Sequence, residues 1–278
     1  MNNLMRELAP VSSDAWQEID SEAHKILSVR LAARRIVDFS GPHGWDSSSA
    51  NLGRTTSLSR GPDSGVEARL RVVQPLVELR VPFELDREEL ENIGRGAKDC
   101  NFDPLHEAAK KMATAEDKTI FHGYGAANID GINQAASGAT LTIPAKYEDY
   151  PSVVAEAVSQ LRQSGVTGPY AIALGPRCYT GLTKTMTGSG HTVLHFVEQL
   201  VGGPAVWAPA VDGAVVVSLR GGDFEMNVGQ DISVGYSSHS GKSVQLYLQE
   251  SFTFRVIGPE AAVPLVYPKA AGKSRRNR

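Results

Sequence analysis

Apolar side chains recur at spacings of three and four over residues 15–37, which predicts one long amphipathic helix there. Asp14 is placed to cap its start, with Gln17 three residues later as the return donor. Leu27, Leu31 and Ile36 are also apolar but lie off this stripe, which predicts a second apolar face. A single apolar stripe most often packs on the protein's own core, whereas a second face is rarely needed in a monomer.

Other helices are expected where a capping residue precedes a proline. The pairs Asp103–Pro104 and Tyr150–Pro151 place proline in a first helical turn, and Gly123 and Gly165 stand where the helices would end. These signals predict one helix from 103 to about 122 and another that follows 149–151 and stops at Gly165. Two shorter helical stretches are expected around 176–185 and 191–200.

Alternating or short, continuous apolar runs predict strands over 66–72, 75–85, 170–174, 206–207, 214–219, 223–228 and 243–257. The pair Gly221–Gly222 is typical of a hairpin turn between 214–219 and 223–228. Residues 41–65 are rich in Gly, Ser and Asn, which predicts a long loop or an extended arm. Loops beyond about 15 residues are often functional. The resulting fold class is α+β.

Composition and charge narrow the class of protein. The 278 residues (29.8 kDa) are 41% hydrophobic and 21% charged, as in a folded globular protein, with no apolar run long enough to span a membrane. The first residues do not resemble a secretory signal, and two cysteines are too few for a disulfide scaffold. A reduced, cytoplasmic protein is therefore expected. Residues 268–278 hold five bases and no acid, which predicts a disordered, solvated basic tail on an acidic body.

The familiar catalytic and cofactor-binding motifs are incomplete or absent in the sequence. Residues 106–110 begin like a zinc-protease helix, but Lys110 stands where the second histidine ligand is needed. The glycines of 123–128 follow a helix rather than a strand, and Asn128 replaces the third glycine of a dinucleotide-binding turn. No phosphate-binding loop, paired-cysteine motif or nucleophile elbow is present in the sequence.

An ordered set of segments resembles one family, the family 1 encapsulin shell proteins, also known as linocin-type bacteriocins. Each segment alone is weak, but together they follow the family's order from residue 4 to about residue 267. The segments are 8–10, 16–20, 34–38, 41–45, 75–80, 116–124, 168–170, 220–224, 229–236 and 250–254.

The resemblance implies a major capsid protein fold of the Hong Kong 97 type, found in tailed phages. It divides the chain into a peripheral domain (1–43, 75–132 and 221–267), an extended arm (44–74), an axial domain (133–220) and the basic tail (268–278). Roughly 60 copies would assemble with T=1 symmetry into a closed nanocompartment in the bacterial cytoplasm. The shell would enclose a dye-decolorising peroxidase or a ferritin-like protein, held by a C-terminal targeting peptide.

The resemblance also implies site residues. The cargo peptide would be bound by Leu27, Arg30, Leu31, Arg34, Asp38, Ile232, Val234 and Tyr236. A five-fold pore would be lined by Lys184, Thr185, Thr187, Gly188, Ser189, Gly190 and His191, and His191 would make it cationic below about pH 6. Some members stack a flavin on a Trp where this chain has Glu88, so no flavin is expected. Neither a catalytic residue nor a metal is implied.

Two other functions remain open at this point. A true viral major capsid protein would share the fold, although the chain shows no N-terminal scaffolding extension. A protease or bacteriocin, labels that some family members carry, finds no support among the motifs.

Overall fold

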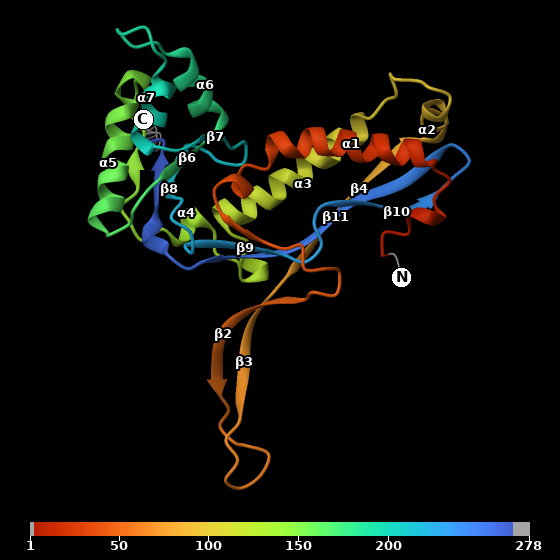
Figure 1. The fold of residues 1–278 in the computed structure, drawn as a ribbon, viewed down its shortest axis with the longest axis horizontal. Helices are drawn as coiled ribbons and strands as arrows, with labels where there is room; N and C mark the ends of the chain where they lie inside the picture. Colours follow the sequence, from red (N-terminus) through yellow and green to blue (C-terminus); the bar gives the residue numbers. More distant parts are fainter. Residues whose placement is uncertain (1–2, 269–278) are drawn as a thin grey trace, which may run out of the picture.

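The computed structural model describes residues 3–268, and the predicted basic tail lies almost wholly outside these residues. The body contains two five-stranded sheets, from which a two-stranded arm projects (Figure 1). The fold is therefore mixed α+β, as the sequence predicts.

The first sheet is built around one long central strand. It consists of β1 (Asp38–Ser40), β9 (Phe224–Val228), β11 (Ser243–Val256), β10 (Ser233–His239) and β4 (Val77–Asp86). The central strand β11 pairs antiparallel with β4, β9 and β10, whereas β1 pairs parallel with β9. Two helices lie side by side on this sheet, α1 (Ser13–Arg30) and α3 (Asp103–His122) (Figure 1). Apolar side chains from α1, α3, β4, β10 and β11 form one core cluster.

The second sheet lies at the other end of the body. Its order is β5 (Leu141–Thr142), β12 (Ala262–Val266), β8 (Ala214–Ser218), β6 (Tyr170–Leu174) and β7 (Ala205–Trp207). Its helices are α5 (Tyr150–Gln163), α6 (Pro176–Lys184) and α7 (Val193–Val201). Every residue of β6 and β8 is buried, which explains their continuous apolar sequences.

The arm is an antiparallel hairpin of β2 (Ser49–Ser57) and β3 (Arg69–Pro75) that extends away from both sheets (Figure 1). The sequence predicts an arm here but not the first strand, because Ser, Asn and Thr in β2 show no alternation. The second strand also begins and ends three residues later than the predicted 66–72. Pairing across the hairpin, rather than burial of one face, holds these strands.

Short elements complete the chain and were mostly not predicted. They are η1 (Arg6–Leu8), η2 (Ala33–Arg35), α2 (Arg87–Gly94), η3 (Gly125–Ala127), α4 (Ile132–Ala135), η4 (Tyr147–Asp149) and η5 (Pro259–Ala261). The sequence does contain one signal for helix α2, the capping residue Asp86. Its side chain accepts hydrogen bonds from the backbone N–H groups of Glu88 and Glu89. Strand β10 was also missed, because its Gly, Ser and Tyr residues weaken the alternation.

The predicted helix over 15–37 is too long, because α1 ends at Arg30. The carboxylate of Asp117 accepts hydrogen bonds from the N–H groups of Ala32 and Ala33, which turns the chain out of the helix. Ile36 therefore lies outside α1 and is buried in the core shared by the two sheets. Leu27 is buried and Leu31 half-buried against the protein's own core. The expected second apolar face on this helix is thus wrong.

The predicted hairpin at Gly221–Gly222 is also wrong. Both glycines have the positive φ of a tight turn, 84° and 81°. The turn, however, carries the chain from β8 in the second sheet to β9 in the first. The last strand, β12, also joins the second sheet, although the family resemblance implies that 221–267 belong to the peripheral domain. The chain crosses between the sheets more often than a division by ranges allows.

Truncation of a buried isoleucine side chain should destabilise the folded chain. Ile120→Ala on α3, where Ile120 is fully buried, is expected to lower the free energy of unfolding by about 2–5 kcal/mol. Its matched control is Ile257→Ala, because Ile257 is 52% exposed, and it should change this free energy by only about 0.5 kcal/mol. Chemical denaturation of the two variants measures the difference. Equal losses would show that Ile120 is not part of a tightly packed core.

Candidate functional site

A cavity of about 320 Å³ opens between α1 and the start of β10. Apolar side chains form part of its wall, and Arg6, Asp20 and His24 add polar groups. The apolar lining residues are Leu4, Ala23, Leu27, Ile232, Val234 and Leu248. This combination suits a ligand with apolar side chains on a polar backbone.

The structure brings only part of the expected cargo-binding set to this cavity. Leu27, Ile232 and Val234 line it. Leu31 and Tyr236 do not line it, but they are half-buried against the same apolar core. These three residues meet because α1 carries Leu27 on one wall of the cavity, and the chain at the start of β10 carries Ile232 and Val234 on another.

Three expected members of that set are held elsewhere. The guanidinium of Arg30 lies 5.6 Å from the ring centre of Trp207 on β7. One carboxylate oxygen of Asp38 accepts a hydrogen bond from the N–H of Gly222, at 2.7 Å. Arg34 is drawn into a group of carboxylates. Their side chains therefore secure the junction between the elements rather than line the cavity.

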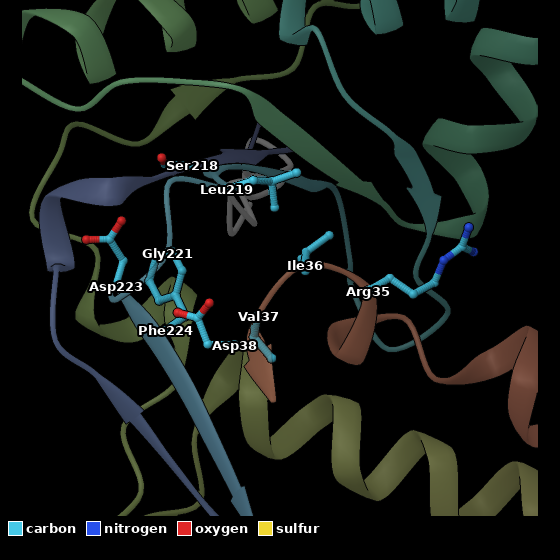
Figure 2. A pocket seen from close by; sticks show the side chains of 9 residues that line it. All are labelled: Arg35, Ile36, Val37, Asp38, Ser218, Leu219, Gly221, Asp223 and Phe224. Carbon is cyan, nitrogen blue, oxygen red and sulfur yellow. The ribbon is translucent and has the colours of Figure 1, made fainter. Parts of the chain in front are cut away.

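Figure 2 shows the place where Asp38 makes this contact, a small cavity of about 90 Å³ between η2–β1 and the turn after β8. The side chain of Arg35 extends away from it. Asp223 also lines this cavity, and the Arg220 guanidinium donates to both of its oxygens, at 2.8 and 2.7 Å. These contacts fix the turn that links the two sheets.

Arg34 is the centre of an ionic group, which we call the charge cluster and define as Arg34, Glu116, Asp231 and Glu250; all but Asp231, whose side chain is 44% exposed, are largely buried. Its Nε lies 2.9 Å from Glu116 Oε1, its Nη1 lies 2.7 Å from Asp231 Oδ1, and its Nη2 lies 3.3 Å from Glu250 Oε2. Glu116 and Glu250 have no exposed surface. The cluster therefore joins the segment after α1 to α3, β11 and the loop before β10.

One guanidinium cannot balance three carboxylates, and burial makes an uncompensated charge costly. Burial, followed by the nearby carboxylate of Glu116, raises the pKa of Glu250 well above its ordinary value. Burial also raises the pKa of Asp117 to about 7, against the effect of its two backbone donors. The interior of this junction thus holds two carboxyl groups whose pKa is higher in the folded chain than in water.

The expected pore residues form a compact loop between α6 and α7. Lys184 is the last residue of α6, and the loop closes by an isolated bridge between Met186 and Thr192. The N–H of Thr187 donates to the carbonyl of His191 at 2.8 Å, and its hydroxyl lies 2.8 Å from that of Ser189. Thr185 is half-buried, whereas Gly188, Ser189 and Gly190 are exposed.

The ring of His191 is exposed but is not isolated. It stacks on the ring of His195, with ring centres 4.8 Å apart, and contacts Phe196 edge-on at 6.2 Å. The second histidine belongs to α7 and lies 3.2 Å from the side-chain nitrogen of Gln199. His195 went unnoticed in the sequence, although a spacing of four residues at a helix start places two rings together.

The segment considered for flavin binding begins a helix. Glu88 is exposed in the first turn of α2 and offers no aromatic face. The guanidinium of Arg80 lies over the ring of Tyr247, 4.1 Å from its centre, and donates to the side chain of Gln249. Arg80 is thus engaged within the sheet.

Sequence reasoning missed Glu116, Asp117 and Glu250, although all three lie in segments that carry the family resemblance. Two adjacent acids in the middle of an otherwise apolar helix face were the available signal. It also missed Leu4 and Arg6, which line the cavity beside α1.

In the described residues 3–268, no group of three or more His, Cys, Asp or Glu side chains could hold a metal ion. In that same part of the chain, no helix is long and apolar enough to cross a membrane.

The fold is that of major capsid proteins of the Hong Kong 97 type, as comparison with solved structures shows. A virus-like particle from Pyrococcus furiosus superposes with a TM-score of 0.62 at 15% identity, covering 89% of this chain and 98% of that one. The capsid of an empty GTA particle gives a TM-score of 0.55 at 16% identity, covering 85% and 89%. This protein is therefore a capsid-fold protein.

Sequence comparison is more specific. The family model described as "encapsulating protein for peroxidase" matches residues 1–253. The type 1 encapsulin shell protein of Rhodospirillum rubrum is 53% identical, with 95% of this chain and 96% of the relative covered. That of Mycobacterium tuberculosis is 45% identical, with 95% and 99% covered. The chain belongs to the type 1 encapsulin shell protein family, whose role is structural and not catalytic.

The raised pKa of Glu250 predicts a pH dependence of stability. Because its pKa is higher in the folded chain than in the unfolded one, its contribution is complete below about pH 4.5 and is lost as the pH rises. Glu250→Gln, whose amide cannot ionise and can still donate to Glu116, should reduce the loss of thermal stability between pH 5 and pH 8. Glu148→Gln, at an exposed position, is the control and should keep the wild-type slope. A Glu250→Gln slope equal to wild type would contradict a raised pKa of Glu250 in the folded chain.

Proposed function

We propose that about 60 copies of this chain assemble with T=1 symmetry into a closed shell that holds one kind of enzyme inside. The family description supports an encapsulating role, with a peroxidase as the enclosed protein. A dye-decolorising peroxidase is therefore the first candidate cargo, and a ferritin-like protein the second. The compartment lies in the bacterial cytoplasm.

The arm supports assembly. Of its apolar side chains, Leu58, Val66, Leu70 and Val73 are between 46% and 62% exposed in the single chain. Exposed apolar groups in such number on a projecting hairpin favour burial against another subunit. The arm thus pairs with a neighbouring copy and closes the shell.

The single observation that carries cargo binding is the cavity between α1 and β10. Its apolar wall and its position beside the edge strand β10 fit an extended peptide whose side chains enter in alternation. The C-terminal peptide of the cargo docks there, with Leu27, Ile232 and Val234 contacting its apolar side chains. Arg34 and Asp38 act by holding the surrounding elements. The shell binds no flavin, since Glu88 replaces the aromatic ring that would stack on it.

Cargo loading should fail when the cavity becomes charged. Ile232→Asp places a carboxylate in the apolar wall, and we expect intact shells that co-purify with less than a tenth of the wild-type cargo. Leu31→Asp tests the neighbouring core position. The control is Val29→Asp, on the exposed face of the same helix, where Val29 is 61% exposed. Electron microscopy checks assembly and quantitative mass spectrometry measures the cargo. Full loading of Ile232→Asp shells would refute docking in this cavity.

The loop between α6 and α7 forms the five-fold pore in this proposal. Five copies of His191 would surround the axis, and histidine is the side chain whose charge changes near neutral pH. Entry of a small cationic probe is therefore expected to slow as the pH falls from 8 to 5, and His191→Ala should weaken that dependence. Thr187→Ala, in the same loop but without a titratable group, is the control. The same pH profile in His191→Ala and wild-type shells would exclude His191 from the pore mechanism.

A viral capsid protein is the alternative that the fold alone allows. The relatives at 43–53% identity are all encapsulin shell proteins, which favours the compartment.

A further inference from the structure

The described chain begins with a short segment that lies across the cavity beside α1. We call residues 3–8 the N-terminal strap. The N–H of Tyr236 on β10 donates to the carbonyl of Leu4 at 2.9 Å. The side-chain amide of Asn3 donates to Gln230 Oε1 at 2.6 Å, and the hydroxyl of Tyr247 donates to the carbonyl of Asn3 at 3.4 Å. The strap is therefore attached to the edge of the first sheet.

The strap makes several polar contacts, and its Leu4 adds an apolar side chain to the cavity wall. Within η1, which is part of the described chain, no side chain is buried. The guanidinium of Arg6 makes an ion pair with Asp20 at 2.8 Å and lies 4.0 Å from the ring centre of Trp16. The Asp20 side chain is 49% exposed, and such ion pairs contribute little. A segment with this kind of attachment opens at low free-energy cost.

The same strap occupies part of the candidate cargo site. Leu4 and Arg6 line the cavity together with Leu27, Ile232 and Val234. Strand β10 ends the sheet order, and the strap carbonyl takes one of its edge donors. An extended peptide that adds to this edge needs the Tyr236 N–H and the space now bounded by Leu4. The strap and such a peptide cannot both use that donor.

We propose that the N-terminal strap is a displaceable lid that competes with the cargo's C-terminal peptide for the edge of β10. This rests on the proposed function, because it assumes that the peptide docks in the cavity beside α1. The occupant is an extended peptide with apolar side chains at alternate positions. In an empty shell the strap covers the edge, and the peptide binds after the strap opens.

Substitution of Met5 can shift the equilibrium between the closed and the open strap without changing a residue that lines the cavity. Its φ of 49° is in the left-handed region, which glycine adopts freely and β-branched residues strongly avoid. Its side chain is 47% exposed and is not among the cavity lining. Met5→Gly therefore favours the closed strap, and Met5→Val favours the open one. Because apparent affinity scales with the open fraction, the two variants should move peptide binding in opposite directions.

Two measurements on assembled shells test the proposal. The first is hydrogen–deuterium exchange of the fragment containing Tyr236 in empty shells, with a β6 fragment as the internal reference. Exchange should be fastest in Met5→Val, intermediate in wild type and slowest in Met5→Gly. The second is loading of a green fluorescent protein fused to the last 20 residues of the protein that co-purifies with wild-type shells. At limiting expression, loading should rise about threefold in Met5→Val and fall about threefold in Met5→Gly.

The outcomes separate the lid from the docking site. Loading that responds to Ile232→Asp but is equal in the two Met5 variants overturns the lid alone. Loading that ignores Ile232→Asp overturns docking in this cavity and the competition with it. Lower loading in Met5→Val than in wild type overturns the competition as well, because the strap would then help to hold the peptide. Equal exchange at Tyr236 in all three shells shows that Met5 does not control the strap and overturns the proposal.

Discussion

The charge cluster around Arg34 is the constraint on which the arrangement of the body depends. A buried guanidinium requires partners, and here the partners come from α3, β11 and the loop before β10. Removing one member would leave a buried charge without its counterpart, which is far more costly than losing a surface ion pair. Asp117, the next residue along α3, ends α1 by accepting two backbone N–H groups. The end of α1 and one wall of the cavity are therefore positioned by electrostatics as well as by apolar packing.

Regular elements were the part of the fold that sequence patterns could predict. The helix over 103–122 and the strand over 170–174 agree with α3 and β6 to the residue, because caps and continuous apolar runs are local signals. The end of α1 depends on Asp117, about 85 residues away, so no local signal marks it. The turn at Gly221–Gly222 has hairpin chemistry, yet Asp38 from another segment fixes it between two sheets. Local patterns cannot specify such long-range partners.

The candidate site was predicted only as far as the family resemblance extends. Leu27, Ile232 and Val234 line one cavity, and their pattern of apolar residues was visible in the sequence. Arg34 and Asp38 were named for polar contacts, but they form internal hydrogen bonds and ion pairs instead. The partners of Arg34 are acids from three separate segments, and the partner of Asp38 is the backbone N–H of Gly222. A sequence does not show which of these groups meet. The strap was missed because a short N-terminal segment carries no periodicity.

The exposed arm makes solubility depend on the state of assembly. The free chain presents four exposed apolar side chains on a hairpin whose outer edges face no other strand within the described chain. Such edges also recruit wrong partners, so the concentration of unassembled chain must stay low. Among the arm's described residues, only Ala50 is buried, so burial within its own chain contributes little to the arm's stability. A shell that loses one subunit would re-expose these edges, and repair would compete with aggregation at the gap.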